Sequence, residues 1–293
     1  MKKFFAFTLC LAMTFSLAAC GGSAAPSAAP SAVSTAESSA GSTTEAAPES
    51  TSEPVEIIVF AAASMTETIN EIIVLYKAAA PNVAIIPTFD SSGTLKTQIE
   101  EGADCDIFIS AAQKQMNQLD IIKDEEANPD KLDYVLQGTR LNLLENKVAL
   151  VVPEGNPAGI SSFGDIANCG MIALGNSDVP VGSYSLEILE YLDLDISAME
   201  TAGRVTYGAN VKEVTTQVSE GAVDCGIVYA TDAFSAGLEV VDTANSEMCK
   251  QVIYPAALMN SCKNVEEAQA FLDFLRSPEA VSVFESVGFS FVG

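Results

Sequence analysis

Two hydrophobic periods alternate along the chain from residue 55 onward. Short continuous apolar runs, typical of buried strands, are separated by stretches in which apolar residues recur every three to four positions, typical of helices. We predict strands over residues 56–61, 83–89, 106–110, 147–152, 171–174, 224–229, 239–242 and 252–259. Helices are predicted to open near Ser64, Ser92, Gln113, Val181, Val211, Val265 and Pro278. This alternation predicts an α/β protein with doubly wound, mostly parallel sheets.

The strand and helix pattern occurs twice, which predicts two lobes. Residues 55–145 form the first α/β unit, and residues 146–254 form the second. The two closing helices, in residues 255–293, are expected to return and pack on the first unit. The predicted lobe boundaries are therefore 55–145 plus 255–293 for one lobe and 146–254 for the other.

The first 54 residues are predicted to lie outside both lobes. A positively charged start and the apolar run Phe4–Leu17 are typical of a signal peptide over residues 1–19. Residues 17–21, Leu-Ala-Ala-Cys-Gly, resemble a bacterial lipobox, which implies cleavage before Cys20, lipidation of its thiol and an anchor outside the cytoplasmic membrane. An ordinary secretory signal with a chance cysteine is the alternative. Residues 20–54 are rich in Ser, Ala, Thr and Pro, which predicts a disordered tether.

Composition excludes several classes of function. The chain has no histidine, which removes Ser-His-Asp and Cys-His enzymes and most zinc or haem sites. Its 39 acidic and 14 basic residues give a net charge of −25, which argues against nucleic acid as a partner. No base is suitably placed to activate a serine, so we do not expect an enzyme.

Neither the cysteines nor the acidic residues predict a cross-link or a metal site. Once the signal peptide and Cys20 are set aside, five cysteines remain, at positions 105, 169, 225, 249 and 262, and none of them forms a CxxC pair. We expect that folding needs no disulfide. Asp104 and Asp106 alternate beside a strand but have no evident third ligand, so a solvated rim is expected there instead of a metal ion.

Four helix starts are candidates for binding a small anion. Helices begin after strands around Ser64, Ser92, Val181 and Val211, and helix N-termini offer free amides and a partial positive charge. No Lys or Arg lies within two residues of the first three, whereas Lys212 is adjacent to the fourth. A serine at a helix start is also a common cap, so residue types alone leave the function open.

Seven motifs together resemble one known family. In the family's order, they are residues 60–66 (FAAASMT), 89–95 (FDSSGTL), 106–111 (DIFISA), 179–184 (VPVGSY), 226–233 (GIVYATDA), 254–257 (YPAA) and 284–289 (FESVGF). They cover essentially all of residues 55–293, and they are similar to those of the periplasmic molybdate-binding proteins of ABC importers.

The resemblance implies a two-lobed, type II periplasmic-binding-protein fold that closes on molybdate or tungstate in the cleft between the lobes. Carried over by motif, Ser64 and Ser92 donate through hydroxyl and amide, Val181 and Val211 through the amide alone, and Tyr229 through its phenol. Molybdenum would then be held only as molybdate, through these same residues, with no cofactor. The resemblance also implies a permease as partner, and we expect a monomer.

Two departures from the family bear on this interpretation. Asp90 stands where the family often has a small neutral residue, and Gly93 replaces a frequent serine. A carboxylate directed into the cleft would repel an anion, so we expect Asp90 to face a helix N-terminus or solvent. A receptor for another tetrahedral oxyanion, such as sulfate or phosphate, and a lipid-tethered surface adhesin remain as alternatives.

Overall fold

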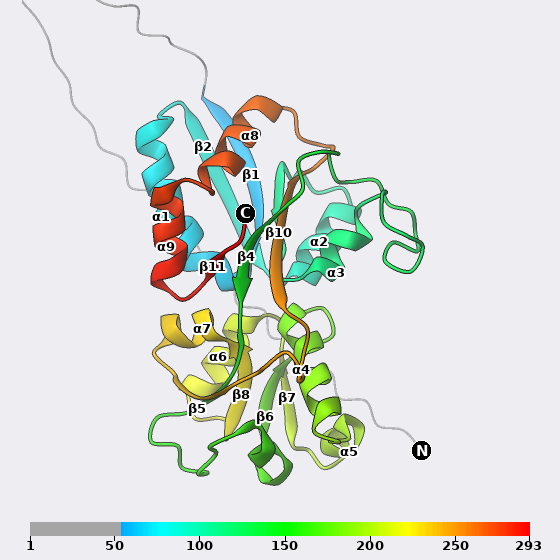
Figure 1. Cartoon of the computed structure of the whole chain (residues 1–293), viewed down its shortest axis with the longest axis vertical. Helices are drawn as coiled ribbons and strands as arrows, with labels where there is room; N and C mark the ends of the chain where they lie inside the picture. Colours follow the sequence, from blue (N-terminus) through cyan, green and yellow to red (C-terminus); the bar gives the residue numbers. More distant parts are fainter. Residues whose placement is uncertain (1–53) are drawn as a thin grey trace, which may run out of the picture. The chain divides into compact units, whose positions relative to one another are not determined.

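The computed structural model describes residues 54–293. The predicted signal peptide, Cys20 and the predicted tether up to residue 53 lie outside the described residues. Within residues 54–293 the chain forms two α/β lobes, each built on its own sheet (Figure 1). None of the helices in this range is long and apolar enough to cross a membrane.

Lobe 1 is built on a sheet with strand order β11-β4-β10-β3-β1-β2. In chain order, the strands are β1 (Val55–Ala62), β2 (Val83–Asp90), β3 (Ile107–Ile109), β4 (Leu141–Asn146), β10 (Val252–Leu258) and β11 (Ser290–Phe291). Its helices are η1 (Ala63–Met65), α1 (Thr66–Ala79), α2 (Ser92–Glu100), α3 (Gln113–Gln118), α8 (Val265–Phe274) and α9 (Pro278–Ser286). Strand β1 runs parallel to β2 and β3, whereas β10 pairs antiparallel with both β3 and β4.

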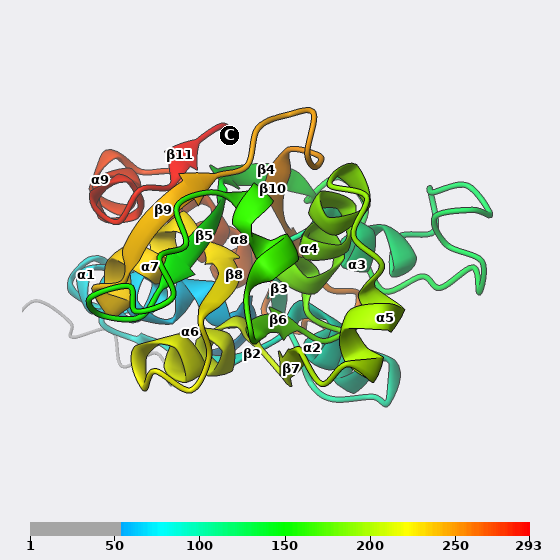
Figure 2. The ribbon, with the colours of Figure 1, turned by 90° about the horizontal axis from the view of Figure 1, so that it is seen from below.

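Lobe 2 is built on a sheet with strand order β7-β6-β8-β5-β9. The strands are β5 (Val148–Val152), β6 (Ile172–Gly175), β7 (Val205–Gly208), β8 (Cys225–Tyr229) and β9 (Glu239–Thr243). Its helices are η2 (Phe163–Asn168), α4 (Pro180–Tyr191), α5 (Ile196–Thr201), α6 (Val211–Ser219) and α7 (Ala230–Ala236). Helices α4 and α6 pack on this sheet (Figure 2). Strand β6 is parallel to β7 and β8, and β5 is antiparallel to β8 and β9.

The chain crosses between the two sheets twice. Only Lys147 separates β4 in the first sheet from β5 in the second, and residues 244–251 lead back from β9 to β10. The predicted two-lobed α/β fold is confirmed. Both sheets, however, are mixed and not mostly parallel, because the strands at the crossings join them antiparallel to their neighbours.

Helix α1 illustrates how the sequence builds the core. Its buried residues Ile69, Ile72 and Tyr76 are three and four positions apart, so they lie on one face of the helix. The Tyr76 ring packs 5.0 Å, centroid to centroid, from both Phe271 and Phe274 of α8. This contact fixes the returning C-terminal helices on lobe 1, as the pattern of the closing segment predicts.

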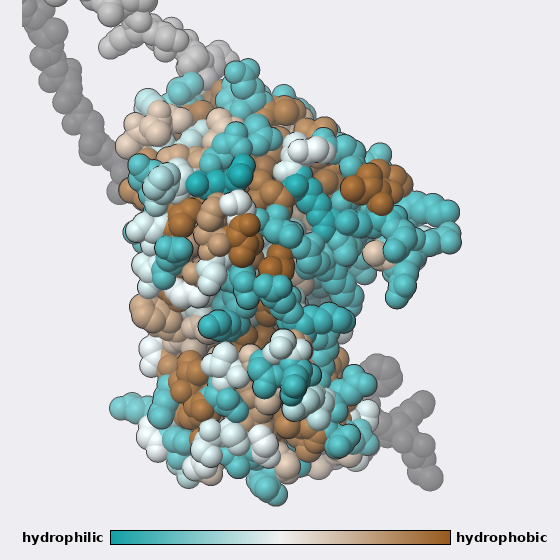
Figure 3. All heavy atoms as spheres, in the orientation of Figure 1, coloured by the Kyte–Doolittle hydropathy of each residue, from teal (hydrophilic) through white to brown (hydrophobic). Residues whose placement is uncertain are grey.

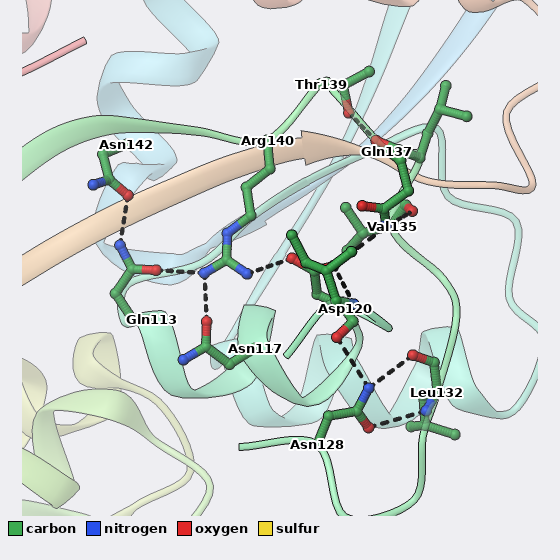
Figure 4. Close-up of polar contacts among 12 residues, drawn as sticks. Gln113, Asn117, Asp120, Asn128, Leu132, Val135, Gln137, Thr139, Arg140 and Asn142 are labelled. Carbon is green, nitrogen blue, oxygen red and sulfur yellow. Dashed lines mark hydrogen bonds and ion pairs between the residues drawn. The ribbon is translucent and has the colours of Figure 1, made fainter. Parts of the chain in front are cut away.

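A buried ion pair holds the long segment between α3 and β4. The Arg140 guanidinium donates to Asp120 Oδ2 at 2.7 Å and also to the side-chain oxygens of Gln113 and Asn117 (Figure 4). The Arg140 and Asp120 side chains are only 15% and 1% exposed. Burial raises the pKa of Asp120, but hydrogen bonds from Arg140 and Gln137 outweigh it and hold this pKa below its ordinary value. The segment itself projects from lobe 1 with a largely hydrophilic surface (Figure 3).

Replacing Arg140 by methionine is expected to lower the free energy of unfolding by about 3 kcal/mol, because it leaves the Asp120 carboxylate buried without its cation. Chemical denaturation measures this loss. Lys131→Met is the control, because the Lys131–Glu125 pair is 69% and 77% exposed and should change stability by less than about 0.5 kcal/mol. Equal losses in the two variants would show that Arg140 contributes only surface charge.

Candidate functional site

Four helix N-termini and the ends of three strands meet at one small cavity between the lobes. Lobe 1 contributes the ends of β1 and β2 and the starts of η1 and α2, and lobe 2 contributes the end of β8 and the starts of α4 and α6. The lining residues are Ala62, Ala63, Ser64, Asp90, Ser91, Ser92, Ala111, Val179, Pro180, Val211 and Tyr229. Because helix N-termini carry free amides and a partial positive charge, this cavity is suited to an anion.

The Ser64 hydroxyl is oriented by a chain of donors behind it. Lys147 N donates to Asn146 Oδ1 at 2.8 Å, which turns the Asn146 amide nitrogen toward the Tyr254 hydroxyl, 3.1 Å away. Tyr254 in turn lies 2.9 Å from Ser64 Oγ. Because Tyr254 accepts from Asn146, its own proton is available to Ser64 Oγ, and in that arrangement the Ser64 proton faces the cavity. Such aligned hydrogen bonds strengthen one another at low dielectric.

The Ser92 hydroxyl is oriented by a single backbone amide. Its hydroxyl accepts a hydrogen bond from Ala111 N at 2.9 Å, and its side chain is fully buried. The amide therefore satisfies an oxygen lone pair and leaves the hydroxyl proton without a competing use. The preceding Ser91 caps α2 instead, because its side chain accepts from Thr94 N.

Helices α4 and α6 offer backbone amides. Helix α4 begins at Pro180, which has no N–H, so Val181 supplies its first free amide. Helix α6 begins at Val211, and its cap Asn210 accepts from Glu213 N, not from Val211. Neither the Val181 nor the Val211 amide has an acceptor among the described residues. Both are therefore available to a ligand.

The Tyr229 hydroxyl is the most informative group in the cavity. Tyr229 is 1% exposed, and within residues 54–293 its hydroxyl has no hydrogen-bond partner. The ring is held edge-on by Tyr254, at a centroid distance of 5.9 Å, and by Tyr184 at 6.4 Å. Burial raises the pKa of Tyr229 well above its ordinary value, so the group stays protonated and can donate. A buried polar group without a partner costs about 1–3 kcal/mol, which indicates a missing acceptor.

No cationic side chain lines this cavity in the described part of the chain. Lys212 follows Val211 directly, but its ammonium is directed to Glu67 and Asp232. Asp90 does line the cavity: its Oδ1 accepts from Ser91 N at 2.7 Å and lies 3.4 Å from Asn210 Nδ2, so the carboxylate sits at the cap of α6. Within residues 54–293, no group of three or more His, Cys, Asp or Glu could hold a metal ion.

The lobes also touch directly beside the cavity. Gly93 N, in the first turn of α2, donates across the gap to Asp178 O at 3.0 Å. A Cβ at position 93 would lie 2.2 Å from that oxygen, so only glycine permits this approach. The glycine at position 93 therefore allows the two lobes to make backbone contact.

The structure brings the predicted site residues together, with one qualification. Ser64, Ser92, Val211 and Tyr229 line the cavity, whereas Val181 is fully buried and is not a lining residue, although its chain neighbours Val179 and Pro180 are. The prediction did not include two supporting residues, Asn146 and Tyr254. Tyr254 lies in a quoted motif and could have been found there; Asn146 falls in a strand that the apolar pattern did not reveal.

Comparison with known proteins gives one family match. The family described as bacterial extracellular solute-binding protein matches residues 57–290. Over 82% of its length, the chain is 33% identical to YvgL of Bacillus subtilis, named for a role as an ABC transporter substrate-binding lipoprotein, and the match covers 88% of YvgL.

Two further relatives are named for molybdate. The chain is 33% identical to the molybdate-binding protein ModA of Escherichia coli, with 80% of this chain and 89% of ModA covered. The solved periplasmic molybdate-binding protein of Azotobacter vinelandii is 21% identical with a TM-score of 0.67, and the match covers 81% of this chain and all of that one. The last comparison concerns the fold alone.

Removing the Tyr229 hydroxyl is expected to leave the stability of the ligand-free protein unchanged or to raise it by up to about 1 kcal/mol, because Tyr229→Phe removes an unpartnered buried group. Tyr254→Phe is the matched comparison. Its hydroxyl contacts Ser64 and Asn146, so its loss should cost about 1–3 kcal/mol. Denaturant titration of both ligand-free variants measures their free energies of unfolding. A larger loss of stability in Tyr229→Phe than in Tyr254→Phe would contradict these roles.

Proposed function

This chain belongs to the family of bacterial extracellular solute-binding proteins, and on that premise we propose that it captures molybdate, and tungstate with it, for uptake by an ABC importer. Its five proposed ligand-binding residues are Ser64, Ser92, Val181, Val211 and Tyr229. The observation that carries the proposal is the buried, unpartnered Tyr229 hydroxyl in a cavity lined with hydrogen-bond donors.

The chemistry of the cavity fits a tetrahedral oxyanion that has no proton. Molybdate is a full dianion at neutral pH, and each of its four oxygens accepts hydrogen bonds. Two serine hydroxyls, one phenol and several helix-terminal amides supply donors in a site from which side-chain cations are absent among the described residues. Charge-assisted hydrogen bonds of this kind are about twice as strong as neutral ones, so no countercharge is required. Sulfate is also a dianion, and we propose that it is rejected by cavity size.

We further propose that the chain acts as a receptor and not as an enzyme, held outside the cytoplasmic membrane by lipid on Cys20. The similarity to YvgL, named as a lipoprotein, and the lipobox-like sequence around Cys20 support the anchor. The cavity supports the absence of catalysis, because the hydroxyls of Ser64, Ser91 and Ser92 are hydrogen-bonded to Tyr254, Thr94 and the Ala111 amide, none of which is a general base. A membrane permease would take the ligand from the opened cleft.

Calorimetric titration of the purified full chain should show one binding site for molybdate and one for tungstate, with sulfate much weaker. Tyr229→Phe should weaken molybdate binding by about 1–3 kcal/mol, the contribution of a hydrogen bond to a charged group. Val211→Ala is the control, because it keeps the backbone amide and should bind as the natural chain does. Absence of binding to all three anions would overturn the proposal, and equal losses in the two variants would contradict the assigned roles.

One observation favours a second candidate, monohydrogen phosphate. The Asp90 carboxylate lines the cavity and is an acceptor, which a protonated oxyanion could use and a proton-free one could not. The neighbouring amides already occupy one of its oxygens, Oδ1, and the carboxylate repels any dianion. Removing the Asp90 charge should therefore strengthen the binding of molybdate and weaken the binding of phosphate, which distinguishes the two ligands.

Replacing Asp90 by asparagine keeps the shape and the Oδ1 acceptor but removes the charge. If molybdate is the ligand, its affinity should rise about 3- to 10-fold, because repulsion between two nearby charges at low dielectric is relieved. Calorimetry with molybdate and phosphate measures the change, and Asp130→Asn, at an exposed position after α3, is the control. A 10-fold or greater loss of phosphate affinity, in a protein that prefers phosphate, would establish the second candidate instead.

A further inference from the structure

Lys212 links the two lobes through carboxylates on opposite sides of the gap. Its Nζ lies 2.7 Å from Glu67 Oε2, in the first turn of α1 of lobe 1. The same nitrogen lies 3.2 Å from Asp232 Oδ1, in α7 of lobe 2. Glu67 comes three residues after Ser64, and Lys212 directly follows Val211. The ion pair therefore joins the first turn of α1, which directly follows η1, to the first turn of α6, and both η1 and α6 line the cavity.

The position of Lys212 is not explained by the stability of its own helix. A lysine in the first turn lies at the positive end of the helix dipole, which is the unfavourable end for a cation. Asp232 supplies a reason for it to stay in place: this carboxylate is fully buried, and Lys212 is the cation beside it in the described structure. Separating the two would leave a buried charge without compensation.

The two partners of Lys212 differ in exposure. The Asp232 side chain is 0% exposed, whereas that of Glu67 is 51% exposed and can be hydrated when the lobes part. Burial raises the pKa of Asp232 to about 6, and Lys212 opposes this rise, so the pair belongs to lobe 2 as a unit. The contact with Glu67 is therefore the one that joins Lys212 to the other lobe.

From this geometry we propose that Lys212 is a positioning residue for closure. Asp232 fixes its ammonium on lobe 2, and Glu67 of lobe 1 engages it when the lobes close, which brings the Ser64 and Val211 ends of the cavity into register. The only lysine beside the anion cavity in the described chain thus acts on the lobes and not on the anion. The inference rests on the proposed oxyanion binding for one of its two readouts only.

The first readout needs no ligand. The Gly93 amide donates across the lobes to Asp178 O, so its hydrogen exchange reports closure directly. In the ligand-free full chain, Glu67→Gln should make Gly93 exchange about 3- to 10-fold faster, the effect of losing one partly buried ion pair. Glu100→Gln is the matched control, because the Glu100–Lys96 pair has the same 2.7 Å separation but lies within α2. Unchanged exchange at Gly93 in Glu67→Gln would overturn the inference.

The second readout is release of molybdate, followed by tyrosine fluorescence after rapid dilution. Glu67→Gln should release molybdate about 3- to 10-fold faster, with the association rate within about twofold of the natural chain, because a closure contact acts on dissociation. The combined change Lys212→Met with Asp232→Asn should add nothing further in the Glu67→Gln background. If the combined change made molybdate release still faster in the Glu67→Gln background, Lys212 would bind the anion itself, and the inference would be overturned. If the natural chain binds no molybdate, the proposed function fails, and the exchange at Gly93 still decides on Lys212.

Discussion

A buried hydrogen-bond donor must find an acceptor, and the organisation of both lobes around the cavity follows from that constraint. The Tyr229 hydroxyl is held by aromatic packing at a position where residues 54–293 offer it no acceptor. Ser92 is placed similarly, since the Ala111 amide donates to its oxygen and leaves its proton unused, and Ser64 is held at the cavity by its hydrogen bond with Tyr254. Each of these groups is unfavourable alone, and together they form a site that an anion completes.

The sheets supply the geometry that makes this arrangement possible. In each lobe, parallel strands end at the same edge, and the helices that follow begin there, so free amides collect on the facing edges of the two sheets. Neutral donors suffice because their dipoles are fixed before the ligand arrives and need no reorganisation. The nearby cation, Lys212, is paired with two carboxylates, so it does not supply the positive end of the cavity.

Much of this could be predicted from the sequence, and the gaps have physical causes. The family motifs, and not the local helix signals, supplied the four predicted residues that line the cavity, Ser64, Ser92, Val211 and Tyr229. Of the local signals, Asn210 does cap α6, but Ser64 makes no cap hydrogen bond. Strand β4 was missed because Asn142, Glu145 and Asn146 interrupt its apolar pattern, although its hydrogen bonds come from β10, which is remote in sequence. The hydrogen bonds of Tyr254 with Asn146 and Ser64 could not be predicted for the same reason. Asn146 is 108 positions from Tyr254 in the sequence, and Ser64 is 190 positions from it.

The position of β10 in the first sheet makes lobe 1 dependent on the last part of the chain. This strand lies between β3 and β4, yet it is formed by residues 252–258, near the end of the chain. Lobe 2, from β5 to β9, is continuous in sequence, so its sheet needs no strand from elsewhere in the chain. The sheet of lobe 1 lacks an inner strand until residues 252–258 join it, and such long-range pairing is intrinsically slow.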